Sequence, residues 1–90
     1  MNGAYLNMVR VYLQQELSET YREHIQVSSE KLIITIPDTA NFSQAYEVLQ
    51  ETIVGSINRI RNREIDLEFT IRSINQERDF KILNKGGLVK

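Results

Sequence analysis

The chain has 90 residues, with 11 basic and 12 acidic side chains, a formal net charge of −1 and no cysteine. This length suits one small domain, and the composition excludes a disulfide framework, cysteine-ligated metals and thiol catalysis. One histidine is too few for a histidine-rich metal or catalytic cluster, and the short apolar runs do not suit a membrane span or a signal peptide. We therefore expect a cytoplasmic globular domain without bulk attraction to nucleic acid or anionic lipid.

Residues 4–23 are predicted to form the first helix. Leu6, Val9, Leu13 and Leu17 follow spacings of three, four and four, which places them on one helix face. This stripe predicts that one side of the helix packs into a core.

Two strands are expected next, at residues 24–28 and 32–36. The first alternates polar and apolar residues, and the second is a β-branched run, which favours a strand. The polar residues 28–31 suit a turn between them, and Pro37 ends the hairpin because proline cannot donate to a strand ladder.

A second helix is predicted over residues 42–61. Its apolar stripe consists of Phe42, Tyr46, Leu49, Ile53, Ile57 and Ile60. Asn41 suits the N-cap, and Gln44 three residues later fits a capping box.

The third strand is predicted over residues 65–72, where apolar and polar residues alternate without interruption. We expect Ile65, Leu67, Phe69 and Ile71 to face the core. The pattern fades after Ile74. Residues 1–75 are therefore predicted to form the domain, and residues 76–90 a C-terminal extension or flexible tail.

The element order α-β-β-α-β predicts an α+β fold. The hairpin strands should be antiparallel, and the second and third strands should be parallel, because a helix connects them. The expected result is a two-layer sandwich with a mixed three-stranded sheet and both helices on one face.

Over roughly residues 4–74, this order is similar to that of ring-building domains of secretion and sporulation machines. It also resembles lipid-associated BON domains and some KH-type RNA binders. The GxxG loop of KH domains and the regular glycines of BON domains are absent, so the resemblance assigns no functional residue.

The residues that could carry chemistry do not form a recognisable catalytic, cofactor or metal site. His24 lacks a nucleophile and an orienting partner at any familiar spacing. Asp66 and Glu68 share one strand face, but acid–base catalysis requires environments that separate their pKa values. Gly86 and Gly87 belong to no phosphate-binding motif. We predict a protein that is not an enzyme, with no cofactor and no evident small-molecule substrate.

Large apolar residues also occupy the sides of the first helix outside its core stripe. They are Tyr5, Met8, Val11 and Tyr12, with Ala4 near the back of the helix. A helix that is apolar almost all round is expected to be buried on more than one side, and tyrosine and methionine are favoured at interfaces. These residues are the predicted partner interface. The alternative is that the segment with Phe80, Ile82 and Leu83 folds back over them.

The sequence thus predicts a small protein-interaction module with a regulatory or assembly role. It would form a homodimer or higher oligomer, or dock on a larger protein, through the outer face of the first helix. The alternative function is nucleic-acid binding by two groups of cations that could contact phosphates. These groups are Arg59, Arg61 and Arg63, and Lys81, Lys85 and Lys90.

Overall fold

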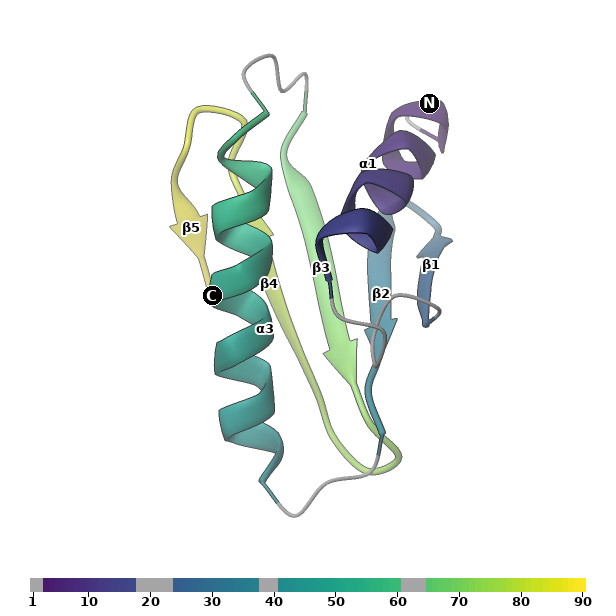
Figure 1. Cartoon of the computed structure of the whole chain (residues 1–90), viewed down its shortest axis with the longest axis vertical. Coiled ribbons are helices and arrows are strands. Elements are labelled where there is room, and N and C mark those ends of the chain that lie inside the picture. Colours follow the sequence, from purple (N-terminus) through teal and green to yellow (C-terminus); the bar gives the residue numbers. More distant parts are fainter. Residues whose placement is uncertain (1–2, 18–23, 38–40, 61–64) are drawn as a thin grey trace.

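The structure, a computed structural model, describes residues 3–17, 24–37, 41–60 and 65–90. In chain order the elements are α1 (Gly3–Glu16), β1 (Ile25–Ser28), β2 (Lys31–Thr35), α3 (Phe42–Ile57), β3 (Leu67–Arg72), β4 (Glu77–Ile82) and β5 (Leu88–Val89). Figure 1 shows both helices on one face of a single sheet, as predicted for an α+β fold of two layers.

The five strands lie in the order β1-β2-β3-β4-β5. The hairpin of β1 and β2 is antiparallel, and β2 runs parallel to β3 with Leu32 opposite Phe69. These two pairings confirm the predictions. The prediction of a three-stranded sheet is wrong, because residues 76–90 contribute β4 and β5, both antiparallel to their neighbours.

β4 joins the sheet because two of its residues continue the core. Phe80 and Ile82 are 3% and 1% exposed, and the Phe80 ring stacks on Phe69 with 5.0 Å between ring centroids. The other four residues of β4 are charged, so the apolar alternation in this segment is too short to stand out in the sequence. β4 is therefore a strand because it pairs with β3, and not because of an apolar pattern in its own residues.

Both helices bury the stripes that their spacing predicted. α1 buries Leu6, Val9 and Leu13, with Leu17 just beyond its end, and residues 18–23 of the predicted helix lie outside the described residues. At the start of α3, the side chain of Asn41 accepts a hydrogen bond of 3.1 Å from the backbone N–H of Gln44, which confirms the predicted cap. The helix ends at Ile57, earlier than predicted.

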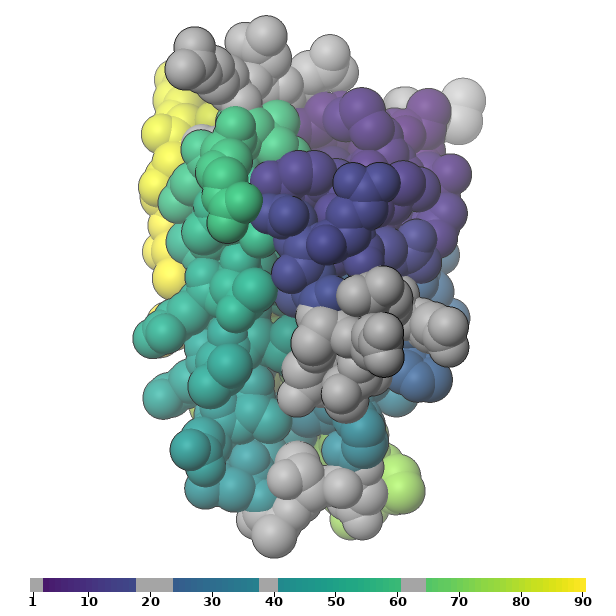
Figure 2. Space-filling view, viewed as in Figure 1, coloured from purple at the N-terminus to yellow at the C-terminus, as the bar shows by residue number. Residues whose placement is uncertain are grey.

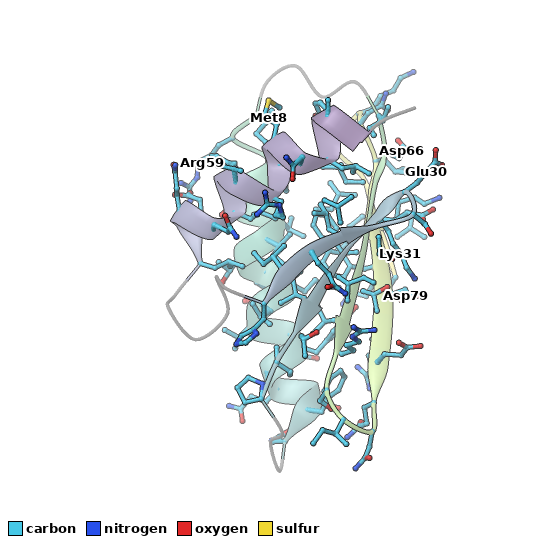
Figure 3. All side chains as sticks on the ribbon, turned by 90° about the vertical axis from the view of Figure 1, so that its right-hand side faces the viewer. Met8, Glu30, Lys31, Arg59, Asp66 and Asp79 are labelled. Carbon is cyan, nitrogen blue, oxygen red and sulfur yellow. The ribbon has the colours of Figure 1, made fainter. Side chains whose placement is uncertain are left out.

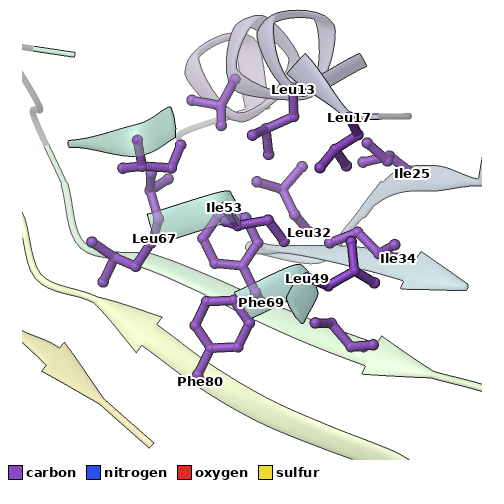
Figure 4. Packing of buried hydrophobic residues seen from close by; sticks show 14 of the residues in the cluster. Leu13, Leu17, Ile25, Leu32, Ile34, Leu49, Ile53, Leu67, Phe69 and Phe80 are labelled. Atoms are coloured by element: carbon purple, nitrogen blue, oxygen red, sulfur yellow. The ribbon is translucent and has the colours of Figure 1, made fainter. Parts of the chain in front are cut away.

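The core lies between the helices and the sheet, and Figure 4 shows its central part. α1 packs over β1 and β2, whereas α3 brings Tyr46 against Phe80 of β4. Neither described helix covers the other face of the sheet (Figure 3). The turn between β1 and β2 consists of Ser29 and Glu30 alone, with Ser29 at a φ of 56°. This tight turn fixes the register of the hairpin.

Candidate interaction surface

The outer side of α1 carries exposed apolar side chains. Met8 is 53% exposed and Val11 is 44% exposed, and Ala4 is exposed on the same side. At 100° per residue, these three positions lie opposite the buried stripe of Leu6, Val9 and Leu13. We call Ala4, Met8 and Val11 the α1 apolar strip. Figure 3 shows Met8 projecting from the helix away from the core.

The two tyrosines of the predicted interface are instead turned toward the interior. Tyr12 packs against the core, and its hydroxyl donates a hydrogen bond of 2.8 Å to the backbone oxygen of Ser56 in α3. Tyr5 also packs against the core, and its buried hydroxyl has no hydrogen-bond partner among the described residues. The structure therefore leaves Met8 and Val11 exposed, whereas both tyrosines are partly buried against the core.

An ion pair adds to the contact between α1 and α3. Arg59, just after α3, places its guanidinium Nη1 2.5 Å from Oε1 of Glu16 at the end of α1. Together with the Tyr12 hydrogen bond, this pair fixes the end of α1 against the end of α3. Figure 2 shows the two segments in contact on the helical face.

The C-terminal segment does not lie over the α1 apolar strip. Phe80 and Ile82 are buried in the core through β4, where Phe80 meets Phe69 and Tyr46. Met8 keeps its exposure with the whole of this segment in place.

The basic residues of the alternative function are not gathered on one surface. Arg59 lies in the helical layer, whereas Lys81 lies on the open face of the sheet, 3.4 Å from Glu68. Lys85 is exposed in the turn between β4 and β5. Arg61 and Arg63 lie outside the described residues. Among the described cations, Arg59 and Lys81 therefore lie on opposite sides of the sheet.

The open face of the sheet carries a charged, polar surface with one shallow hollow of about 250 Å³. Its polar lining residues are Lys31, Glu68, Thr70, Asp79, Lys81 and Lys90. The Thr70 hydroxyl donates a hydrogen bond of 2.6 Å to Asp79. Cations and carboxylates alternate here, so the hollow does not have a single strong charge that would select an anion or a cation.

Two of the three candidate acid–base residues are bound to other groups of the domain. His24 is exposed beside β1, Asp66 accepts a hydrogen bond of 2.8 Å from the backbone N–H of Asn84, and Glu68 pairs with Lys81. Within the described residues, no group of three or more histidines and carboxylates is placed to hold a metal ion.

One titratable group of the described part of the chain has a shifted pKa with a clear cause. Burial raises the pKa of the Tyr46 hydroxyl, while a hydrogen bond of 3.0 Å from Gln50 and the nearby Arg78 guanidinium partly lower it. Arg78 lies over the Tyr46 ring, 5.2 Å from its centroid. Tyr46 thus lies between the core and a surface cation, where its contacts stabilise the fold.

The fold defines a small α+β domain with a mixed five-stranded sheet and one face covered by helices. Searches against family models, curated proteins and solved structures find no match to this chain. Neither of the described helices is long and apolar enough to cross a bilayer.

Proposed function

We propose that this protein is a non-enzymatic interaction or assembly module of the cytoplasm that self-associates through the α1 apolar strip. The observation that supports the proposal is the exposure of Met8 and Val11 on the side of α1 opposite its core stripe. A surface helix ordinarily places polar residues there.

The strip is suited to meeting its own copy. Across a two-fold axis, two antiparallel α1 helices would bring Met8 of one copy near Val11 of the other, without opposing charges. Each side chain contributes at most about 1.5–3 kcal/mol when fully buried, and both are already half-buried. The proposal therefore implies a modest affinity, in which the oligomer dissociates on dilution.

The test is the molar mass in solution, measured by size-exclusion chromatography with light scattering at tens of micromolar protein. Met8→Glu places a carboxylate beside its own copy and should abolish association through the α1 apolar strip, which lowers the molar mass, with an unchanged fold by circular dichroism. Ile74→Glu is the matched control, because Ile74 is 79% exposed and its turn lies at the other end of the molecule from α1 (Figure 1). It should leave the mass unchanged. A parent protein that is monomeric throughout this range would overturn the proposal.

Nucleic-acid binding has weaker support, because Arg59 pairs with Glu16 and Lys81 with Glu68 on opposite sides of the sheet. The salt dependence of binding distinguishes the two functions. Phosphate-driven binding weakens steeply with added salt, whereas association of apolar strips does not. Single-stranded and duplex oligonucleotides at low and high salt provide the direct comparison.

A further inference from the structure

β1 is an edge strand whose outward backbone groups can be assigned from the hairpin. The N–H of Thr35 donates a hydrogen bond of 3.0 Å to the carbonyl of His24, so these two residues form a hydrogen-bonded pair. In an antiparallel ladder such pairs alternate, so Gln26 also bonds toward β2, and the N–H and C=O groups of Ile25 and Val27 point away from it. No described residue pairs with these outward groups. Figure 3 presents this edge to the viewer.

β1 also lacks the features that normally protect an edge from pairing. Proteins block exposed edges with charged side chains, proline or a bulge. β1 reads Ile-Gln-Val-Ser, without charge or proline, and its register with β2 is continuous. The opposite edge differs, because β5 has two residues and pairs only with the end of β4, and the rest of β4 carries the charged residues Glu77, Arg78 and Asp79. Of the two edges, β1 is the one that offers a complete pairing surface.

We propose that a second copy of this chain adds to β1 antiparallel, with Gln26 on the two-fold axis, so that the two sheets become one continuous sheet. In this register Ile25 lies opposite Val27 of the other copy, and Val27 lies opposite its Ile25. Each of these pairs exchanges two backbone hydrogen bonds. All the outward groups of Ile25 and Val27 are then satisfied.

A second copy is favoured over an unrelated peptide because the edge is self-complementary. On the helical side, Val27 is half-buried and would gain contact with Ile25 of the other copy. On the open face, Gln26 would meet its own copy, and two amides can hydrogen-bond to each other. No charge of β1 opposes itself across the axis.

This contact is separate from the α1 apolar strip, which lies on the outer side of the helical layer. A protomer with two different two-fold self-contacts joins more than two copies, in a closed or an extended assembly, whereas one such contact stops at a dimer. The edge contact would therefore extend the proposed self-association into larger assembly, although it does not depend on the α1 contact.

Cysteine cross-linking tests the edge contact directly, because the chain has no cysteine of its own. In the proposed register Gln26 opposes its copy in a non-hydrogen-bonded pair, with Cα atoms about 4.5 Å apart, which is within the range for a disulfide. Gln26→Cys should therefore form disulfide-linked dimers under mild oxidation at least about tenfold faster than Gln76→Cys, since a paired site presents a high local thiol concentration. Gln76 is exposed in the turn between β3 and β4 and is the matched control.

Gln26→Lys supplies a second test that does not rely on a disulfide. Two like charges facing each other should raise the dissociation constant of the edge contact at least about tenfold, whereas Gln76→Lys should leave it unchanged. Both tests are repeated with Met8→Glu, which removes the α1 contact. Equal cross-linking at positions 26 and 76 would overturn the edge contact, as would cross-linking that disappears in the Met8→Glu protein.

Discussion

On the side of the sheet that faces the helices, Leu67, Phe69 and Ile71 of β3 are fully buried, whereas the other side of the same strand carries Glu68, Thr70 and Arg72. The covered side is packed by rings and branched chains. The open side is held by polar contacts, which include the Lys81–Glu68 ion pair and the hydrogen bond from Thr70 to Asp79. One strand thus takes part in two different kinds of stabilisation.

The open face nevertheless contains buried side chains. Ile33 is 7% exposed and Thr70 is 2% exposed, although neither belongs to the core cluster. They are neighbours across β2 and β3, and the same face of these strands carries Lys31, Glu68 and Arg72. The aliphatic stems of such long side chains can cover apolar surface. Burial in this domain therefore does not mark the core by itself, and the two faces should respond differently to truncation.

The largest effect should come from Phe80→Ala on the covered face. It removes a ring that stacks on Phe69 and meets Tyr46, and should lower the free energy of unfolding by about 3–5 kcal/mol, as should Phe69→Ala. Urea denaturation measures the loss, with the exposed residue change Glu77→Ala in the same strand as control. A loss below about 1 kcal/mol for Phe80→Ala would show that β4 does not belong to the core.

Thr70→Val tests how much a polar contact on the open face contributes to the free energy of unfolding. The substitution keeps the buried volume and removes the hydroxyl that bonds to Asp79, whose exposed carboxylate can turn to water. The expected loss is about 1 kcal/mol or less, measured by the same urea titration. A loss as large as that of Phe80→Ala would mean that both faces contribute equally to stability.

Truncation after Asn84 should have a smaller effect. It removes β5, whose Leu88 and Val89 are 41% and 49% exposed and pair only with the end of β4. We expect the melting temperature to fall by less than about 8 °C, which corresponds to about 1 kcal/mol for a domain of this size. The variant Leu88→Ser in the full chain should have still less effect. Failure of the truncated protein to fold would place β5 within the cooperative unit.

The Tyr46 hydroxyl should make the free energy of unfolding depend on pH in the alkaline range. Its pKa is raised above the ordinary 10.0 in the folded state by burial, so folding favours the neutral hydroxyl. That contribution is complete below pH 10 and is lost as the pH rises through the folded-state pKa. The free energy of unfolding should therefore fall less steeply above pH 10 in Tyr46→Phe than in the parent. Parallel curves for the two proteins would contradict this assignment.

Local patterns predicted most of the covered face. The alternation in β3 placed Phe69 in the core, and the pair Asn41 and Gln44 marked the start of α3. The helix between β2 and β3 indicated their parallel arrangement. Each of these inferences uses residues within one element, or the direction of one connection, which a single sequence contains.

The candidate surface was less predictable, because partners distant in the chain decide it. Tyr12 and Met8 are both large apolar positions outside the core stripe, yet Tyr12 is bonded to Ser56, 44 residues away, and Met8 is exposed. The charged segment 77–82 gave little indication of a strand until it was paired with β3. The free edge of β1 likewise exists only because no other described strand lies beside it.

The sequence by itself determined which side of each helix and strand faces a core, because apolar residues at periods of 3.6 and 2 must share one environment. Only the tertiary structure decided that β4 and β5 complete the sheet and that Arg59 and Lys81 lie on opposite sides of it. It also decided which apolar residues of α1 remain in water. These outcomes depend on contacts between different segments of the chain. The periodicity within one segment does not determine the free energy of such contacts.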